Sequence, residues 1–222
     1  MSDLNPNDLV LGFLSYVVFL FSTTCHEAAH ALVAKRGGDS TAALGGQISL
    51  NPIPHIRRSP FGMVVMPLVG FFLAGGYMIG WASAPYDPLW ERRYPKRAAW
   101  MALAGPAANF TLMLLAGVTL RVGTTLGVFQ RHTANSSMKF VTTILMITFM
   151  LNLVLGTFNL LPVPPLDGST GIMLLMSESG AQKYLDWLRG NSFAIAGLLV
   201  GLLIFQRILP IIQSFALHLL LD

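Results

Sequence analysis

LVLGFLSYVVFLFSTTCHEAAHALVA, residues 9–34, is long and apolar enough to cross a lipid bilayer as one helix. The stretch holds one carboxylate and no Lys or Arg, yet it contains His26, Glu27 and His30. Such polar groups are costly inside a membrane span, so they indicate a function. Two His four residues apart share one helix face and can bind one zinc ion, and Glu27 is placed to accept a proton from zinc-activated water. The alternative is a pair of core histidines bonded to neighbouring helices.

The composition predicts an all-α polytopic membrane protein with one domain over residues 1–222. Hydrophobic residues make up 54% of the 222 residues and charged residues only 11%, against about 25% in soluble domains. The net charge of +4 does not indicate nucleic-acid binding, because basic residues in a membrane protein chiefly report orientation. Cys25 is the only cysteine, which excludes an internal disulfide and favours a small buried residue over a metal or redox role.

Apolar stretches predict four to five transmembrane helices. They are residues 9–34, 61–82, 98–120, 140–161 and 192–221. The polar break after the first helix holds GGQISLNPIPHI at 45–56, in which an Ile-Ser-Leu run between Gly and Pro predicts a short strand or β-hairpin.

The stretch at 61–82 is either a kinked span or a re-entrant segment. It carries several helix breakers, namely Pro67, Gly70, Gly75, Gly76 and Gly80. Membranes tolerate a re-entrant backbone where protein covers it.

The distribution of basic residues favours the re-entrant form. If 61–82 returns to the side that it leaves, ten basic residues share one face and three lie on the other, whereas a full span divides them almost evenly. The ten are Lys35, Arg36, Arg57, Arg58, Arg92, Arg93, Lys96, Arg97, Lys183 and Arg189. The positive-inside rule then predicts that this face is cytoplasmic and that the N-terminus is outside.

A hydrolytic zinc site needs a third protein ligand and an open position for water. No Glu follows Glu27 before Glu91, and most other carboxylates lie in charged loops. Asp167 differs, because it follows a proline-rich run at the end of an apolar helix. Proline cannot continue a helix, and unwound backbone there could direct Asp167 towards a metal. The alternative is that Asp167 caps the next helix.

The expected depth of His26 in the membrane supports the interpretation of Asp167 as a metal ligand. His26 lies roughly 15 Å before the basic end of its helix, at 1.5 Å per residue. If 61–82 is re-entrant, the helix at 140–161 runs towards that same end and brings Asp167 to the face of the His pair. If 61–82 spans, Asp167 ends on the opposite face.

Three motifs resemble those of the site-2 protease (M50) family of intramembrane zinc metallopeptidases. They are HEAAH at 26–30, GPAAN at 105–109 and NLLPVPPLDG at 159–168, and the resemblance covers about residues 9–175. The 45–56 stretch is similar to the hairpin region of the short bacterial members, although Arg57-Arg58 stands where an Asp commonly follows. The resemblance implies one zinc ion per chain, held by His26, His30 and Asp167, with Glu27 as the catalytic base.

Other polar residues have two interpretations each. Asn159 could bond the substrate, or it could cap the unwound turn. Asn109 is expected to bond a neighbouring helix. His55 is expected to be a loop residue rather than a ligand or a substrate contact. Arg207, inside the last apolar stretch, is expected to snorkel or to pair with a carboxylate.

The leading hypothesis is therefore a zinc endopeptidase in a bacterial inner membrane, with its active site near the cytoplasmic face. Its partners would be the lipid bilayer and single-pass or other membrane-protein substrates, with no nucleic acid. A homo-oligomer or an accessory membrane partner is compatible with the sequence. A divalent-metal transporter also uses intramembrane His and acidic groups, and a non-catalytic zinc-stabilised scaffold is a third class.

Overall fold

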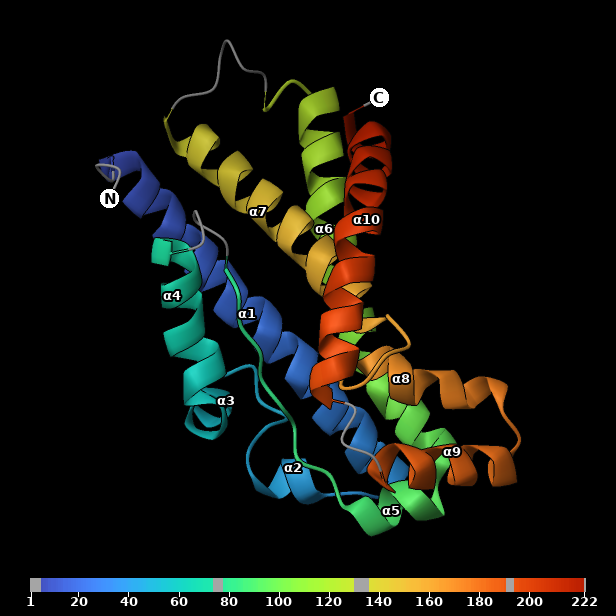
Figure 1. Cartoon of the computed structure of the whole chain (residues 1–222). Coiled ribbons are helices and arrows are strands. Elements are labelled where there is room, and N and C mark those ends of the chain that lie inside the picture. The colour runs from blue at the N-terminus through green and yellow to red at the C-terminus, as the bar shows by residue number, and fades with distance from the viewer. Residues whose placement is uncertain (1–4, 74–77, 130–135, 191–193, 222) are drawn as a thin grey trace.

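The computed structural model describes residues 5–73, 78–129, 136–190 and 194–221 (Figure 1). Four helices in this part are long and apolar enough to cross a membrane: α1 (Pro6–Gly37), α6 (Pro95–Thr125), α7 (Ser136–Asn159) and α10 (Ala194–Leu221). Gly75 and Gly76, which contributed to the prediction for 61–82, lie outside the described residues, as does Ser192 at the start of the last apolar stretch.

The first helix has clear signals at both ends. Asn5 caps the N-terminus, where its side chain accepts from the Asn7 N–H while Asp8 reaches back to the Asn5 backbone. Pro6 follows at the first helical position, which tolerates its missing N–H. Gly38 ends the helix at φ 104°, a left-handed conformation that favours glycine. These signals fix the length of α1 and therefore the depth of the His pair within it.

The predicted β-hairpin at 45–56 is wrong, because the described residues contain no strand. After the short helix α2 (Thr41–Leu44), the chain turns and forms α3 (Pro52–Arg58). Asn51 caps α3 by accepting from the Ile53 N–H at 3.0 Å, and Pro52 occupies the first helical position. Proline cannot donate to a β ladder, and Asn-Pro is a strong helix-start signal. The Ile-Ser-Leu run is too short to outweigh it.

The following segment enters and leaves the bundle at the same end. A π-helical turn (Phe61–Val65) leads into α4 (Met66–Leu73), which is bent by 111° from α3. Beyond the gap the chain runs back in extended form, and the Trp81 N–H donates to the Gly62 carbonyl at 3.1 Å. Gly80 permits this close approach, because a Cβ there would overlap the Gly62 carbonyl oxygen. The return leg reaches α5 (Pro88–Arg93), at the lower end of Figure 1.

Polar side chains form hydrogen bonds between the return leg, residues 78–87, and the segment 39–58 that contains α2 and α3. The Ser83 carbonyl accepts from Gln47 Nε2 at 3.2 Å and from Arg58 Nε at 3.1 Å. Asp39 accepts from the Asp87 N–H at 2.8 Å and also from Thr41. Burial raises the pKa of Asp39, but these hydrogen bonds outweigh it and hold the pKa below its ordinary value.

Two apolar clusters stabilise the opposite ends of the bundle. The lower one joins α1, α5, α6, a 3-10 helix (Ile172–Leu175) and α9 (Glu178–Gly190). Its buried residues are Ala34, Trp90, Ala98, Ala99, Met101, Met173, Ala181 and Leu185. The upper one joins α6, α7 and α10 around Ala116, Leu120, Phe149 and Leu220. Between them α1, α6 and α7 cross, and the polar groups of the candidate site lie at this crossing.

Candidate metal centre

The predicted ligands come from two distant parts of the chain. His26 and His30 lie one turn apart on α1, and Asp167 is the first residue of the short helix α8 (Asp167–Gly171). His26 Nε2 lies 3.0 Å from Asp167 Oδ2, and His30 Nε2 lies 3.4 Å from the same oxygen. The two Nε2 atoms are 2.9 Å apart. The structure therefore brings these three side chains to one point.

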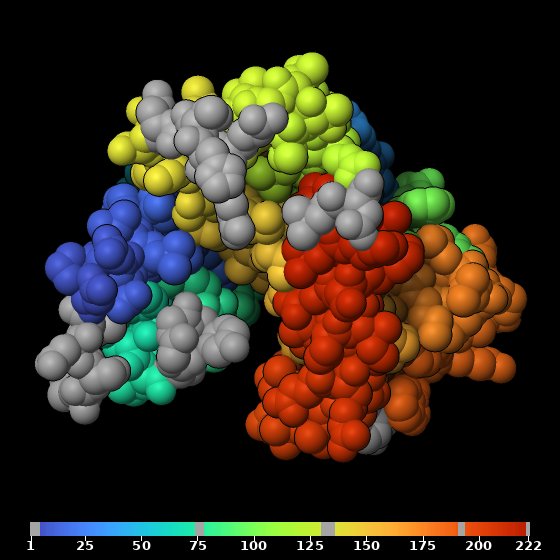
Figure 2. Space-filling model, turned by 90° about the horizontal axis from the view of Figure 1, so that it is seen from above, coloured from blue at the N-terminus to red at the C-terminus, as the bar shows by residue number. Residues whose placement is uncertain are grey.

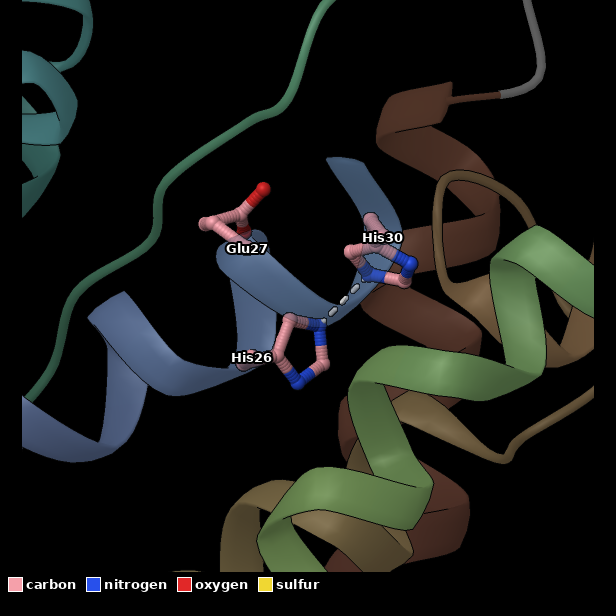
Figure 3. Close-up of side chains that lie close together, drawn as sticks. All are labelled: His26, Glu27 and His30. Atoms are coloured by element: carbon pink, nitrogen blue, oxygen red, sulfur yellow. Dashed lines mark hydrogen bonds between the residues drawn. The ribbon is translucent and has the colours of Figure 1, made fainter. Parts of the chain in front are cut away.

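The His rings are held edge to face, with centroids 4.6 Å apart (Figure 3). His30 Nδ1 lies 2.7 Å from the Met101 carbonyl oxygen, which can only accept. The Nδ1 of His30 must therefore carry the proton, and its Nε2 lone pair points at the site. His26 Nδ1 lies 2.6 Å from Asn109 Oδ1, which leaves the Nε2 of His26 free as well.

A cation fits this set of donors. Two unprotonated ring nitrogens and a carboxylate oxygen would repel one another at these distances without positive charge between them. Asp167 Oδ2 is buried and has no hydrogen-bond partner among the described residues. A tetrahedral zinc ion about 2.0–2.1 Å from each ligand places the ligand atoms about 3.3 Å apart. The observed separations are close to that value.

The space beside the ligands is provided by Gly105 on α6. A Cβ at this position would overlap the Nε2 atoms of both His26 and His30. Gly105 lies one helical turn before Asn109 on the same face, so one side of α6 both makes room beside the two rings and contacts His26. The motif at 105–109 can be recognised in the sequence, but its contact with the two His rings is seen only in the structure.

Glu27 is buried beside the pair. One ligand atom each from His26, Glu27 and His30 lie within 4.8 Å of one another, so this trio could also hold an ion. Figure 3 shows that Glu27 leaves α1 to one side, whereas the two His rings lie edge to face on another side of the helix. Asp167 is a better candidate than Glu27 for a third ligand, because one Asp167 oxygen approaches both Nε2 atoms.

The loop before Asp167 is supported by α10. Turns replace the helix after Asn159, as the prolines predict, and the chain reaches Asp167 with Leu166 extended. Gly197 lets α10 approach this loop, because a Cβ there would overlap the Pro164 carbonyl oxygen. Asp167 is the first residue of α8 and not its N-cap, which is Leu166. Its side chain is 22% exposed, so the site is not sealed.

The other sequence candidates lie away from this cluster or make local bonds. Asn159 Nδ2 donates to the Leu155 carbonyl of its own helix at 3.0 Å. His55 lies in α3 rather than in a loop; it is fully buried, and its Nε2 contacts the Ser49 carbonyl at 3.0 Å. Cys25 is partly buried on α1, next to His26.

Two buried residues were missed by the sequence analysis. Asn152 on α7 accepts from Asn109 Nδ2, and Ser22 on α1 accepts from Asn152 Nδ2. The available signal for Asn152 was an Asn in the middle of an apolar stretch.

Comparison with known proteins places the chain in a family. The sequence profile of peptidase family M50 matches residues 114–204, a region that includes Asp167 but not the His pair. A Bacillus subtilis protein named "Putative zinc metalloprotease YwhC" is 34% identical over 162 residues, which cover 71% of this chain and 68% of the relative. The chain belongs to peptidase family M50.

Mycobacterial relatives agree with this assignment. A Mycobacterium tuberculosis protein named "Putative zinc metalloprotease Rip2" is 30% identical over 152 residues, which cover 68% of this chain and 52% of that protein. The Mycolicibacterium smegmatis protein of the same name is 29% identical over 150 residues. No solved structure matches the chain. Family membership and four candidate spans identify a multi-pass membrane peptidase, which confirms the resemblance to site-2 proteases.

Proposed function

We propose that this M50 peptidase is an intramembrane zinc endopeptidase that cuts peptide bonds in or near transmembrane segments of other membrane proteins. The observation that carries the proposal is the meeting of His26 Nε2 and His30 Nε2, on a helix that can span a bilayer, with Asp167 Oδ2 of the short helix α8. The zinc metalloprotease names of the relatives support the choice of metal. One ion per chain would fill this site.

The residues have separate roles in the proposed reaction. A zinc ion in such a site lowers the pKa of water and polarises a substrate carbonyl. His26, His30 and Asp167 would hold the ion, and Glu27 would accept the proton of the attacking water and pass it to the leaving amine. The burial of Glu27 keeps its carboxylate out of bulk water and next to the ring nitrogens.

A transmembrane substrate must unwind before it is cut, because helical carbonyls are held in i to i+4 hydrogen bonds. Seen from the end that carries the α6–α7 connection, α10 stands apart from α4 and a notch opens between them (Figure 2). This notch offers an opened substrate segment a sideways route from the bilayer. Asn159, at the end of α7, is a candidate for bonding the substrate backbone.

The orientation of the chain follows from its basic residues. Those of α3, α5 and α9 gather at the end where 61–82 enters and returns, together with Lys35 and Arg36. We infer that this end is cytoplasmic and that the N-terminus faces outward, in a bacterial inner membrane. A homo-oligomer or an accessory membrane protein would be compatible with the exposed apolar faces of α10.

The test is the substitution of Glu27 by Gln. Quantitative proteomics of membrane fragments should compare cells that produce wild type, Glu27→Gln or Glu178→Gln, and each protein should be purified for zinc analysis. Fragments should depend on Glu27 but not on the exposed Glu178, and all three proteins should retain zinc. Fragments that persist in Glu27→Gln cells would refute the mechanism. Zinc flux into proteoliposomes would instead support the transporter, and intact zinc binding with neither activity would support the scaffold.

A further inference from the structure

A chain of side-chain amides connects α7 to the metal centre through α6. Asn152 Nδ2 donates to the Thr148 carbonyl at 2.9 Å and to Ser22 Oγ at 2.9 Å. Asn152 Oδ1 accepts from Asn109 Nδ2 at 2.8 Å. Asn109 Oδ1 in turn lies 2.6 Å from His26 Nδ1. Three transmembrane helices therefore meet at one row of hydrogen bonds that ends on a metal ligand.

The direction of every bond in this row is fixed by a main-chain carbonyl. The Thr148 carbonyl can only accept, so Asn152 must turn its Nδ2 towards it and its Oδ1 towards Asn109. Asn109 must then present Nδ2 to Asn152 and Oδ1 to His26. An amide oxygen can only accept, so the Nδ1 of His26 must be the protonated nitrogen. The Nε2 of His26 is left with its lone pair directed at the ligand cluster.

Burial makes this arrangement rigid. Ser22, Asn109 and Asn152 have no exposed surface, so no bulk water can replace a partner that turns away. Reversing the Asn109 amide would bring two acceptors together at Asn152 and two donors together at His26. Such a network has one satisfied arrangement, which is the one that prepares His26 to bind a cation.

The two His ligands are thus oriented by different means. His30 is held directly by the Met101 main-chain carbonyl of α6. His26 has no such carbonyl at its Nδ1 and depends on the Asn109 side chain instead. Asn152 adds nothing to the ion itself, but it decides which way Asn109 points.

We infer that Asn109 and Asn152 are positioning residues of the zinc site, which set the tautomer and ring orientation of His26. The inference rests on the proposed zinc site. An amide pair that only joined helices would affect stability but would not depend on which atom faces His26. Outer groups that orient a ligating His typically contribute about 10- to 100-fold in metal affinity.

The experiment measures zinc affinity of the purified full chain by competition with a chromophoric chelator, and thermal unfolding with excess chelator present. Asn109→Leu should bind zinc about 10- to 100-fold more weakly. Asn109→Asp should lose less affinity than Asn109→Leu, because its carboxylate still accepts the proton of His26 Nδ1, although it can no longer donate to Asn152 Oδ1. Asn152→Leu should lose about fivefold, the value of one net hydrogen bond.

Thr143→Val is the matched control. It makes a Thr-to-Val change in α7 outside the row, since the Thr143 hydroxyl donates to the Lys139 carbonyl of its own helix. Its zinc affinity should equal that of wild type. Wild-type affinity in Asn109→Leu, or an equal loss in Thr143→Val, would overturn the positioning role alone. Wild-type protein that binds no zinc would overturn the proposed function as well.

Discussion

Replacing Gly105 by Ala should remove zinc from the site without harming the helix that carries it. The new Cβ would overlap His30 Nε2 and would lie 2.5 Å from His26 Nε2 and 2.6 Å from His26 Cε1. Ordinary van der Waals contact begins at 3.4 Å, so the rings must retreat by almost 1 Å. Alanine is the better helix former by about 1 kcal/mol, so the helix itself is not weakened.

The loss of affinity follows from this displacement. A zinc–nitrogen bond is about 2.0–2.1 Å long, and a ring that moves away by almost 1 Å no longer coordinates. Disturbing only the groups behind a ligand costs about 10- to 100-fold, so losing a ligand should cost at least about 100-fold. That factor corresponds to about 2.7 kcal/mol of binding free energy.

The assay is zinc competition on the purified protein, with thermal unfolding of the metal-free form as a check of the fold. Gly117→Ala is the matched control, because it makes the same substitution in α6 but meets the Phe149 ring at 3.0 Å instead of the ligands. We expect the control to bind zinc as wild type does. Wild-type affinity in Gly105→Ala would show that the ion does not lie between the His rings and α6.

Three further outcomes are expected. Asp167→Ala should bind zinc at least about 100-fold more weakly in the same competition assay, because it removes a ligand; unchanged binding would favour Glu27 as the third ligand. Lys96→Met should lower the melting temperature, because the Lys96 ammonium group donates to the carbonyls of Met173, Leu174 and Met176. Removing the ammonium group should cost about 2–4 kcal/mol of folding stability. Lys183→Met, at an exposed position, is the control, and an equal shift in melting temperature there would contradict the reasoning. Asp39 has a lowered pKa in the folded chain, so its contribution to stability is present above the unfolded pKa of about 4 and is lost as pH falls below it. The difference in melting temperature between wild type and Asp39→Asn should therefore shrink below about pH 4, and a difference that grows there would refute the assignment.

Much of the fold could be predicted because the membrane leaves few alternatives. Apart from the stretch at 61–82, which folds back and is extended over residues 78–82, each apolar stretch of spanning length must be helical, since unpaired backbone groups are too costly in lipid. The stretch at 98–120 is therefore α6, with one extra turn at each end in the structure. The wrong prediction of a β-hairpin at 45–56 concerns a polar segment between the apolar stretches. In such a segment local sequence signals decide between helix and strand. There the Asn51-Pro52 pair outweighed the apolar run.

The candidate site was predictable only in part. The spacing of His26 and His30 fixes their common face by helix geometry alone, and elimination led to Asp167. The groups behind them were not accessible in this way. Gly105 is important because a side chain there would overlap the two His rings. Asn152 acts on His26 only through Asn109. Such roles depend on how α1, α6 and α7 cross, which no single stretch of sequence encodes.

The approach of Gly197 to the Pro164 carbonyl has a consequence for how the protein is made. During synthesis the His-bearing helix leaves the ribosome well before the carboxylate, and the helix that braces the loop follows both. A nascent chain that has inserted α1, α6 and α7 but not α10 holds two imidazoles while the loop that carries Asp167 still lacks its support. The candidate metal centre is thus completed only when α10 joins the other three helices in the membrane.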